Sequence, residues 1–346
     1  MTLRERLRSM VGRVGFALLL AAVAVPFSEK MYWYVTGYGL ADLLLGYFLP
    51  SFILLWVIDA FHVRRLGALF LAAAVFGFVA EGVLVGTLYE GGPLGLFNVS
   101  YTPLAWHAPL SILFGWHWLG RRLAAGSLRG LVAGCAAVGL LWGVWATAWW
   151  LPENVADPAL LAAGARLGQW PAADFALHAF TFTGVVAAAH WLLARGGRRP
   201  SFRPGRVEGA LGGAGLLFFF AGVVSAVPWA PLKLLPLLAL IFIALYVNKR
   251  REPPGSLLAE ARGPARPAAL AALFVMPAAA VVVYAALAAL APPVDVLYAL
   301  TAYGLVLLPA LLGGVAFVAA VAQAVVLAAG GGGRGERENL STRNEE

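Results

Sequence analysis

Long runs of apolar residues, separated by short polar or basic segments, dominate the pattern of this chain. The hydrocarbon core of a membrane is about 30 Å thick, and a helix needs roughly 20 apolar residues to cross it. The pattern therefore predicts an all-α, polytopic integral membrane bundle of about ten transmembrane helices. The expected spans lie near residues 14–36, 39–61, 67–88, 103–119, 128–150, 172–194, 209–229, 232–248, 267–290 and 297–328.

The basic residues fall almost entirely in alternate gaps between these runs. With a cytoplasmic N-terminus, all but three of the 25 Lys and Arg residues lie on the cytoplasmic side, the three being Lys30, Arg166 and Lys233. Cytoplasmic loops are enriched in Lys and Arg, so we predict a cytoplasmic (inner) membrane protein with both termini cytoplasmic. Basic loops in this position meet anionic headgroups. Despite the formal net charge of +8, we therefore expect membrane lipids as partners, and no nucleic acid.

The first apolar run has a second interpretation as a cleaved signal peptide. Basic residues precede a short apolar stretch that ends in small residues, as in secretory signals. However, Pro26 follows almost at once, and residues 27–36 extend the segment to spanning length. This length favours a first helix that is retained.

Composition divides the chain into two unequal halves. Residues 1–195 hold all five His and most of the Trp, and we predict that they form a polar, aromatic-rich bundle of six helices that carries the functional site. Residues 196–208 are basic and rich in Gly and Pro, as in a cytoplasmic linker. Residues 209–328 predict a plainer apolar bundle of four helices. Residues 329–346 are Gly-rich and then charged, which predicts a disordered cytoplasmic tail.

Four titratable residues are expected at one depth in the outer third of the bilayer. With a helical rise of 1.5 Å per residue, they lie roughly 19–24 Å from the cytoplasmic end of their helices. Because an ionisable group in hydrocarbon costs about 2.5–3.5 kcal/mol, it is usually functional there. We predict a catalytic carboxylate/histidine site made of Glu29, Glu81, His107 and His178. We expect the substrate to be lined by Asp42, Tyr89, Glu90, Tyr101, Trp106 and Asp174.

Glu81 is the most informative single residue of this set. Its own helix offers no basic partner, so a partner must come from another helix, and His107, His178 and Lys30 lie at suitable depth. Gly77, one turn earlier, allows a second helix to approach the same face closely. Asp174 precedes His178 by one helical turn, so these two residues share a face and are able to pair.

The sequence leaves the cofactor and the metal content open. Glu81, His107 and His178 are the residues that would ligate a metal. Cys135 is the only cysteine, which excludes an internal disulfide and a cysteine metal cage. Two predicted helices each carry two His, but at about 100° per residue the members of each pair point in different directions. This geometry argues against a di-haem site.

Three functions remain open at this stage, because no motif of a known membrane enzyme is present. The first is an enzyme that acts on a lipid-soluble substrate, such as an isoprenoid or a lipid, with Glu81 as acid or base. The second is a proton-coupled secondary transporter. The third is a non-catalytic membrane subunit or scaffold, in which the polar layer only fixes helix packing. The oligomeric state is not predicted.

Overall fold

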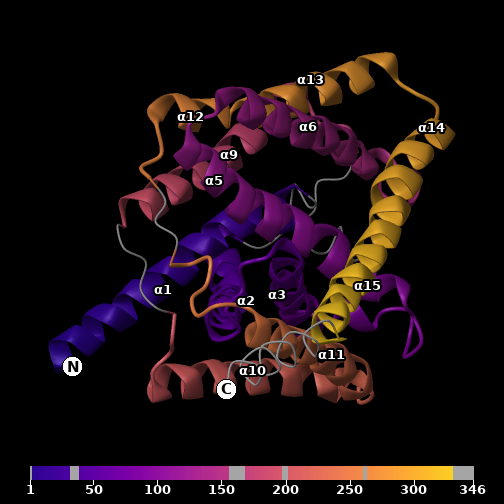
Figure 1. Ribbon diagram of the computed structural model, residues 1–346. Coiled ribbons are helices and arrows are strands. Elements are labelled where there is room, and N and C mark those ends of the chain that lie inside the picture. The colour runs from indigo at the N-terminus through magenta and orange to yellow at the C-terminus, as the bar shows by residue number, and fades with distance from the viewer. Residues whose placement is uncertain (1, 32–38, 156–167, 197–201, 260–262, 330–346) are drawn as a thin grey trace, which may run out of the picture.

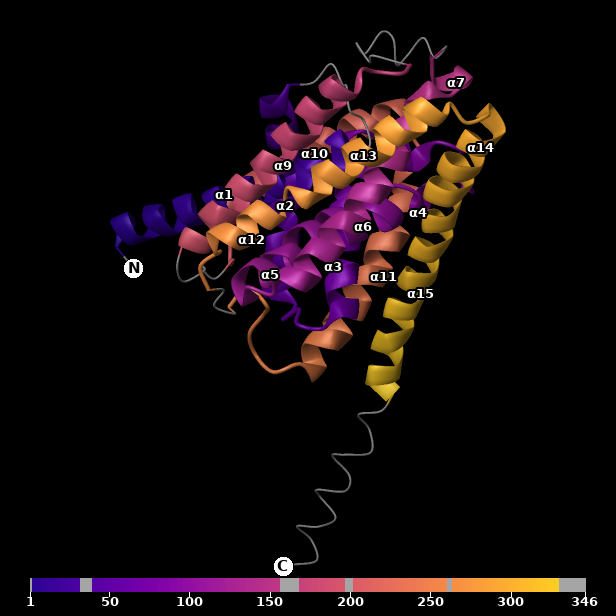
Figure 2. The same cartoon turned by 90° about the horizontal axis from the view of Figure 1, so that it is seen from above.

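The computed structural model describes residues 2–31, 39–155, 168–196, 202–259 and 263–329. All regular elements in these residues are helices, and nine of them are long and apolar enough to cross a membrane. The predicted all-α, polytopic class is therefore confirmed. Figures 1 and 2 show that most of the long helices lie side by side, with α15 along one edge of the bundle.

The first half of the chain begins with three long helices, two of which end in π-helical turns. Thr2 caps the first helix, because its hydroxyl accepts the Glu5 amide proton while the Glu5 carboxylate accepts the Thr2 amide proton. The helix therefore starts well before the first predicted span. In order, the elements are α1 (Leu3–Val25), η1 (Pro26–Lys30), α2 (Leu40–Ala60), α3 (Leu66–Val79), η2 (Ala80–Leu84), η3 (Thr87–Tyr89), α4 (Phe97–Ser100), η4 (Pro103–Trp118), α5 (Leu119–Ala125), α6 (Leu128–Ala146), η5 (Thr147–Trp150), α7 (Pro152–Val155) and α9 (Ala172–Arg195).

The second half contains four long helical spans in its described residues, two of which are made of consecutive shorter elements. Its elements are α10 (Arg206–Ala226), α11 (Ala230–Arg251), α12 (Pro267–Ala272), α13 (Val275–Leu290), α14 (Val294–Tyr298), η6 (Ala299–Leu307) and α15 (Leu308–Ala329). The last predicted span corresponds to α14, η6 and α15, which form one helical segment of 34 residues to Leu327. The predicted tail lies almost entirely outside the described residues, as does part of the predicted linker.

The predicted span at 103–119 differs from the others. It is helical, since η4 continues directly into α5, yet it is not among the nine helices that are apolar enough to cross a membrane. Proline, tryptophan and histidine residues lower its hydropathy. Packing against α1, α3 and α15 shields this helix, so its polar side chains face protein. This environment explains why a less apolar helix is tolerated here.

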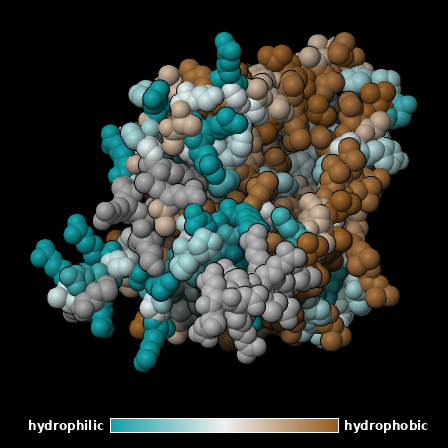
Figure 3. Space-filling view, viewed as in Figure 1, coloured by the Kyte–Doolittle hydropathy of each residue, from teal (hydrophilic) through white to brown (hydrophobic). Residues whose placement is uncertain are grey.

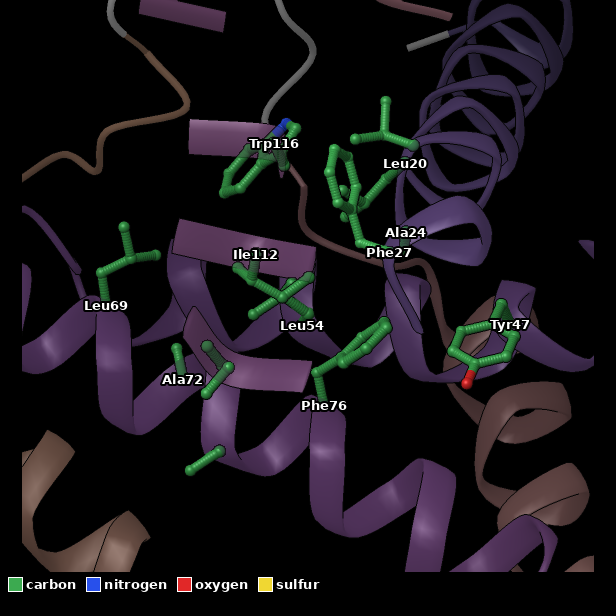
Figure 4. Close-up of a cluster of buried hydrophobic side chains, with 14 of the residues drawn as sticks. Leu20, Ala24, Phe27, Tyr47, Leu54, Leu69, Ala72, Phe76, Ile112 and Trp116 are labelled. Carbon is green, nitrogen blue, oxygen red and sulfur yellow. The ribbon is translucent and has the colours of Figure 1, made fainter. Parts of the chain in front are cut away.

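The apolar core lies where α1, α2, α3 and η4 meet. Figure 4 shows Leu20, Phe27, Leu54, Phe76 and Trp116 within this cluster, contributed by all four helices and by η1. Each of these five side chains is fully buried or nearly so. The core thus fixes the relative positions of the segments that carry the polar residues described below.

Helices of the two predicted halves pack against each other. α6 runs along α13, and α11 and α15 both contact α3. Gly139 and Gly143 let α6 approach closely, since a Cβ on either would lie 2.2 Å and 2.5 Å from the carbonyl oxygens of Met276 and Ala280. The division into two bundles stays a prediction.

Candidate functional site

Three predicted site residues lie on π-helical segments of three different helices. Glu29 belongs to η1 at the end of α1, Glu81 to η2 at the end of α3, and His107 to η4. Pro26 begins η1 and Pro103 begins η4, and proline removes a backbone donor and disturbs the α-helical ladder. A π-helical turn rotates the side chains that follow it and often occurs at functional sites. Here the turns direct all three ionisable side chains toward one cavity.

Gly77 brings the helix of Glu81 against the helix of His107, as predicted. A Cβ on Gly77 would lie only 2.7 Å from both the Cα and the carbonyl oxygen of Pro103. The obstacle is backbone, which cannot rotate away as a side chain can. The missing side chain therefore permits the contact that brings Glu81 and His107 into hydrogen-bonding distance.

Glu81 and His107 form the buried centre of the site. Nε2 of His107 lies 2.5 Å from Oε1 of Glu81, and the side chains of both residues are at most a tenth exposed. The Thr87 hydroxyl donates to the other carboxylate oxygen. An ionised carboxylate only accepts hydrogen bonds, so with Glu81 ionised Nε2 of His107 carries a proton. The pair is thus able to exchange a proton between two titratable groups.

The other nitrogen of His107 continues the network to two serines. Nδ1 lies 2.9 Å from the Ser28 hydroxyl, which lies 2.7 Å from the Ser111 hydroxyl. In the neutral ring with Nε2 protonated, Nδ1 accepts the proton of Ser28, and Ser111 then donates to Ser28. Together with Glu81, these residues form a continuous hydrogen-bonded chain across three helices.

Glu29 lies beside this chain but has its own partner. The Tyr47 hydroxyl, from α2, donates to Oε1 of Glu29 at 2.7 Å. The Tyr47 ring packs against the rings of Phe76 and His107, with centroids 5.9 and 6.0 Å apart. Tyr47 thus holds the carboxylate in place while it covers one face of the imidazole.

A cavity of about 330 Å³ opens beside these groups. Glu29, Glu81 and His107 line it, and so do three of the predicted substrate-lining residues, Glu90, Tyr101 and Trp106. Glu90 lies outside the spanning segments, and its pKa is raised above the ordinary value, mainly by partial burial and further by the charge of Glu81. The remaining lining residues are Ser28, Thr87, Asn98 and Thr102.

His178 is placed apart from the Glu81–His107 pair. Its Nε2 lies 2.9 Å from the backbone carbonyl oxygen of Lys30, and its ring packs against Trp142 and Phe182. Asp174, the predicted partner of His178, is exposed. The structure joins His178 to η1 through the Lys30 carbonyl oxygen and does not place it among the cavity-lining residues given above, although the two sites were expected at one depth.

Asp42 and Tyr89, two further residues predicted to line the substrate, form hydrogen bonds with the backbone near their own positions. Asp42 accepts the Gly39 amide proton at the start of α2, with 3.1 Å between Oδ2 and N. The Tyr89 hydroxyl donates to the Gly82 carbonyl at 2.8 Å and its ring packs against Trp229. Both residues stabilise local structure, and Tyr89 supports the turn that follows Glu81.

The described residues hold no group of three or more His, Cys, Asp or Glu side chains arranged to bind a metal. Of the suggested ligands, only Glu81 and His107 lie together. Cys135 is buried in α6. What the described arrangement offers is acid–base chemistry by paired groups rather than a ligand cage.

Several polar residues of the site were missed from the sequence. Ser28, Thr87, Asn98, Thr102 and Ser111 carry no charge, so the cost of burying an ionisable group did not mark them. Ser28 and Thr102 each lie close to a proline that begins a π-helical segment, and this proximity was the one available signal. Asn98 donates to the carbonyl oxygens of Thr87 and Glu90 and holds the loop over the cavity.

Comparisons with known proteins found no similarity for this chain: no protein-family model matches it, and neither the curated proteins nor the solved structures give a significant match.

Proposed function

We propose that this multi-pass membrane protein is an enzyme that acts on a lipid-soluble substrate, of the isoprenoid or lipid class. The observation that carries the proposal is the buried Glu81–His107 pair, which opens on a cavity lined by polar side chains. A positioned acid or base contributes about 10²–10⁴-fold to a reaction rate. Glu81 acts as the acid or base, and His107 passes the proton along the chain to Ser28.

A second hollow beside the cavity supports a substrate with an apolar chain. A groove of about 680 Å³ runs between α4 and α15 and is lined almost entirely by apolar side chains. Phe97 and Ser100 of α4 line this groove, whereas Asn98 of α4 and Tyr101, the residue that follows α4, line the cavity. One helix wall thus separates a polar site from an apolar groove. The reacting polar group of the substrate enters the cavity and its chain lies along α15, where Figure 3 shows a hydrophobic surface.

The test compares lipid extracts of cells that express wild-type protein, Glu81→Gln or Asp295→Asn. Glutamine retains the size of Glu81 and a hydrogen-bonding group but does not exchange a proton. Asp295 is an exposed carboxylate in α14, away from the cavity, and serves as the matched control. We expect one lipid to be depleted and another to appear with wild type and Asp295→Asn. With Glu81→Gln the conversion falls by at least about 10²-fold. Full conversion by Glu81→Gln at equal protein level would disprove the proposal.

Proton-coupled transport is the second candidate, favoured by the three carboxylates of Glu29, Glu81 and Glu90 beside His107 in one cavity. Transport predicts unchanged lipid extracts together with uptake of protons into proteoliposomes that Glu81→Gln abolishes. Unchanged extracts and no proton movement would leave the non-catalytic subunit or scaffold.

A further inference from the structure

A second large cleft lies far from the cavity, between the start of α1 and the segment that leads into α10. Its volume is about 850 Å³, and its lining includes Arg6, Arg13, Arg203, Arg206 and Glu208. We call it the arginine cleft. Arg6 and Arg13 lie on one face of α1, two helical turns apart, so both point to the same side. The cleft thus brings together basic groups from distant parts of the sequence.

Two of the four guanidinium groups of the arginine cleft have no carboxylate partner among the described residues. Arg13 donates from Nε and Nη2 to the two oxygens of Glu208, at 2.8 and 2.5 Å, so this carboxylate of the cleft lining is already paired. Arg203 is mostly exposed, and its Nε lies 3.6 Å from Oδ2 of Asp59. Arg6 and Arg206 are exposed, and among the described residues no acidic side chain forms an ion pair with either.

The walls of the cleft are held rigidly. Glu208 also accepts the Gly205 amide proton at 2.6 Å, so the carboxylate that binds Arg13 also caps α10. Phe202 is fully buried between Phe16 of α1 and Phe52 of α2, with ring centroids 6.2 and 5.1 Å apart. These contacts fix the backbone segment that carries Arg203 and Arg206 against α1, so both arginines are kept on the same side as Arg6 and Arg13.

The cleft adjoins a helix whose surface suits lipid chains. No described residue of α10 is buried, and Leu211, Leu217 and Phe218 each expose about 70% of their surface. The start of α1, which carries Arg6, is hydrophilic on the face that Figure 3 shows. A ligand with an anionic head and apolar chains would match both surfaces at once.

We propose that the arginine cleft binds the phosphate group of an anionic phospholipid, with the acyl chains of the lipid along α10. Guanidinium groups bind phosphate through paired, charge-assisted hydrogen bonds, and basic pockets between membrane helices bind anionic headgroups. Arg6 and Arg206 supply the free guanidinium groups, whereas Arg13 and Glu208 hold the walls. This site is independent of the reaction at Glu81.

The test uses full-length protein purified in mild detergent and stripped of lipid. Native mass spectrometry then follows the binding of phosphatidylglycerol, phosphatidylcholine or inorganic phosphate. A basic residue near a membrane surface contributes about 1 kcal/mol to the binding of anionic lipid. The double variant Arg6→Gln/Arg206→Gln is therefore expected to bind phosphatidylglycerol about 30-fold more weakly. Arg121→Gln/Arg129→Gln removes the same charge from exposed positions on the same expected side of the membrane and serves as the control.

Saturable binding of one phosphatidylglycerol, lost in the cleft variant and kept in the control, would support the proposal. Equal losses in both variants would overturn it, because attraction would then depend on overall charge. Equal affinity for phosphatidylcholine would overturn the role of the anionic headgroup. Inorganic phosphate binding as tightly as the lipid would identify a free-phosphate site and overturn the assignment of a lipid.

Discussion

α3, taken with η2, and α10 are two apolar helices of nearly the same composition with opposite places in the protein. Their mean hydropathies are 2.0 and 1.8, yet 89% of the most apolar window of the first is buried and none of the second. α3 packs against α2, η4, α11 and α15, whereas all the described side chains of α10 are at least partly exposed. Hydropathy thus reports that a helix is able to span a membrane, but not whether it faces lipid or protein.

The difference matters because of where the ionisable groups lie. Glu81 is held inside protein by His107 and Thr87, so the cost of placing a carboxylate in hydrocarbon is offset by hydrogen bonds. On α10 the one carboxylate, Glu208, lies in the first turn, next to Arg13. The buried helix thus carries a carboxylate within its apolar span, whereas the exposed helix carries its charged residues in its first turn.

The largest expected effect comes from removing the charged group of the buried helix. Glu81→Leu leaves His107 buried without its carboxylate, and breaking a buried pair in this way costs about 3–5 kcal/mol of unfolding free energy. The double variant Glu81→Leu/His107→Leu replaces both partners by apolar groups and is expected to recover most of that loss. Equilibrium unfolding in mixed micelles with SDS measures both values.

The control for the Glu81 and His107 variants is Ser225→Ala on α10. The Ser225 hydroxyl is exposed and donates to the Gly222 carbonyl oxygen of its own helix. We expect a change within about 0.5 kcal/mol. A double variant as unstable as Glu81→Leu would show that the pair is required for the fold itself, which would weaken a functional interpretation.

An intermediate effect is expected when a methyl group is added to each helix. Gly77→Ala places a Cβ 2.7 Å from the Pro103 backbone, and such overpacking costs about 1–3 kcal/mol. Gly213→Ala on α10 meets no atom within 4 Å and should stabilise the helix by about 0.5–1 kcal/mol. The same unfolding measurement distinguishes the loss of stability expected for Gly77→Ala from the gain expected for Gly213→Ala. Equal effects would mean that α3 and η4 are not in the contact described.

The smallest effect concerns pH and Glu90, at the edge of the buried site. Its folded-state pKa is raised by partial burial and by Glu81, so ionisation of Glu90 opposes folding. The resulting destabilisation is absent below the unfolded-state pKa of about 4.3 and develops as pH rises through the folded-state pKa. Glu90→Gln should therefore unfold at a slightly higher temperature than wild type at pH 7, with no difference below pH 4. A variant that is less stable at pH 7 would contradict this.

Much of the architecture was predictable because a membrane imposes one dominant constraint. The spans at 128–150, 172–194 and 267–290 agree closely with α6 through η5, α9, and α12 through α13. The prediction that Glu81 needs a partner from another helix, and that Gly77 would admit that helix, followed from burial cost and from the absence of a Cβ. The structure has that partner in His107. The prediction named three candidates and gave no means to choose among them.

The sequence by itself determined the helical class and, within the described residues, the number of spans to within one, because length and hydropathy act along a single helix. Only the tertiary structure decided which of the ionisable residues meet. Rotation about the helix axis and the order of packing separate His178 from Glu81, two residues that were expected at one depth, while π-helical turns bring Glu29 and His107 beside Glu81. These features depend on contacts between distant segments, such as Gly77 against Pro103. Hydropathy is a property of single residues and does not specify such contacts.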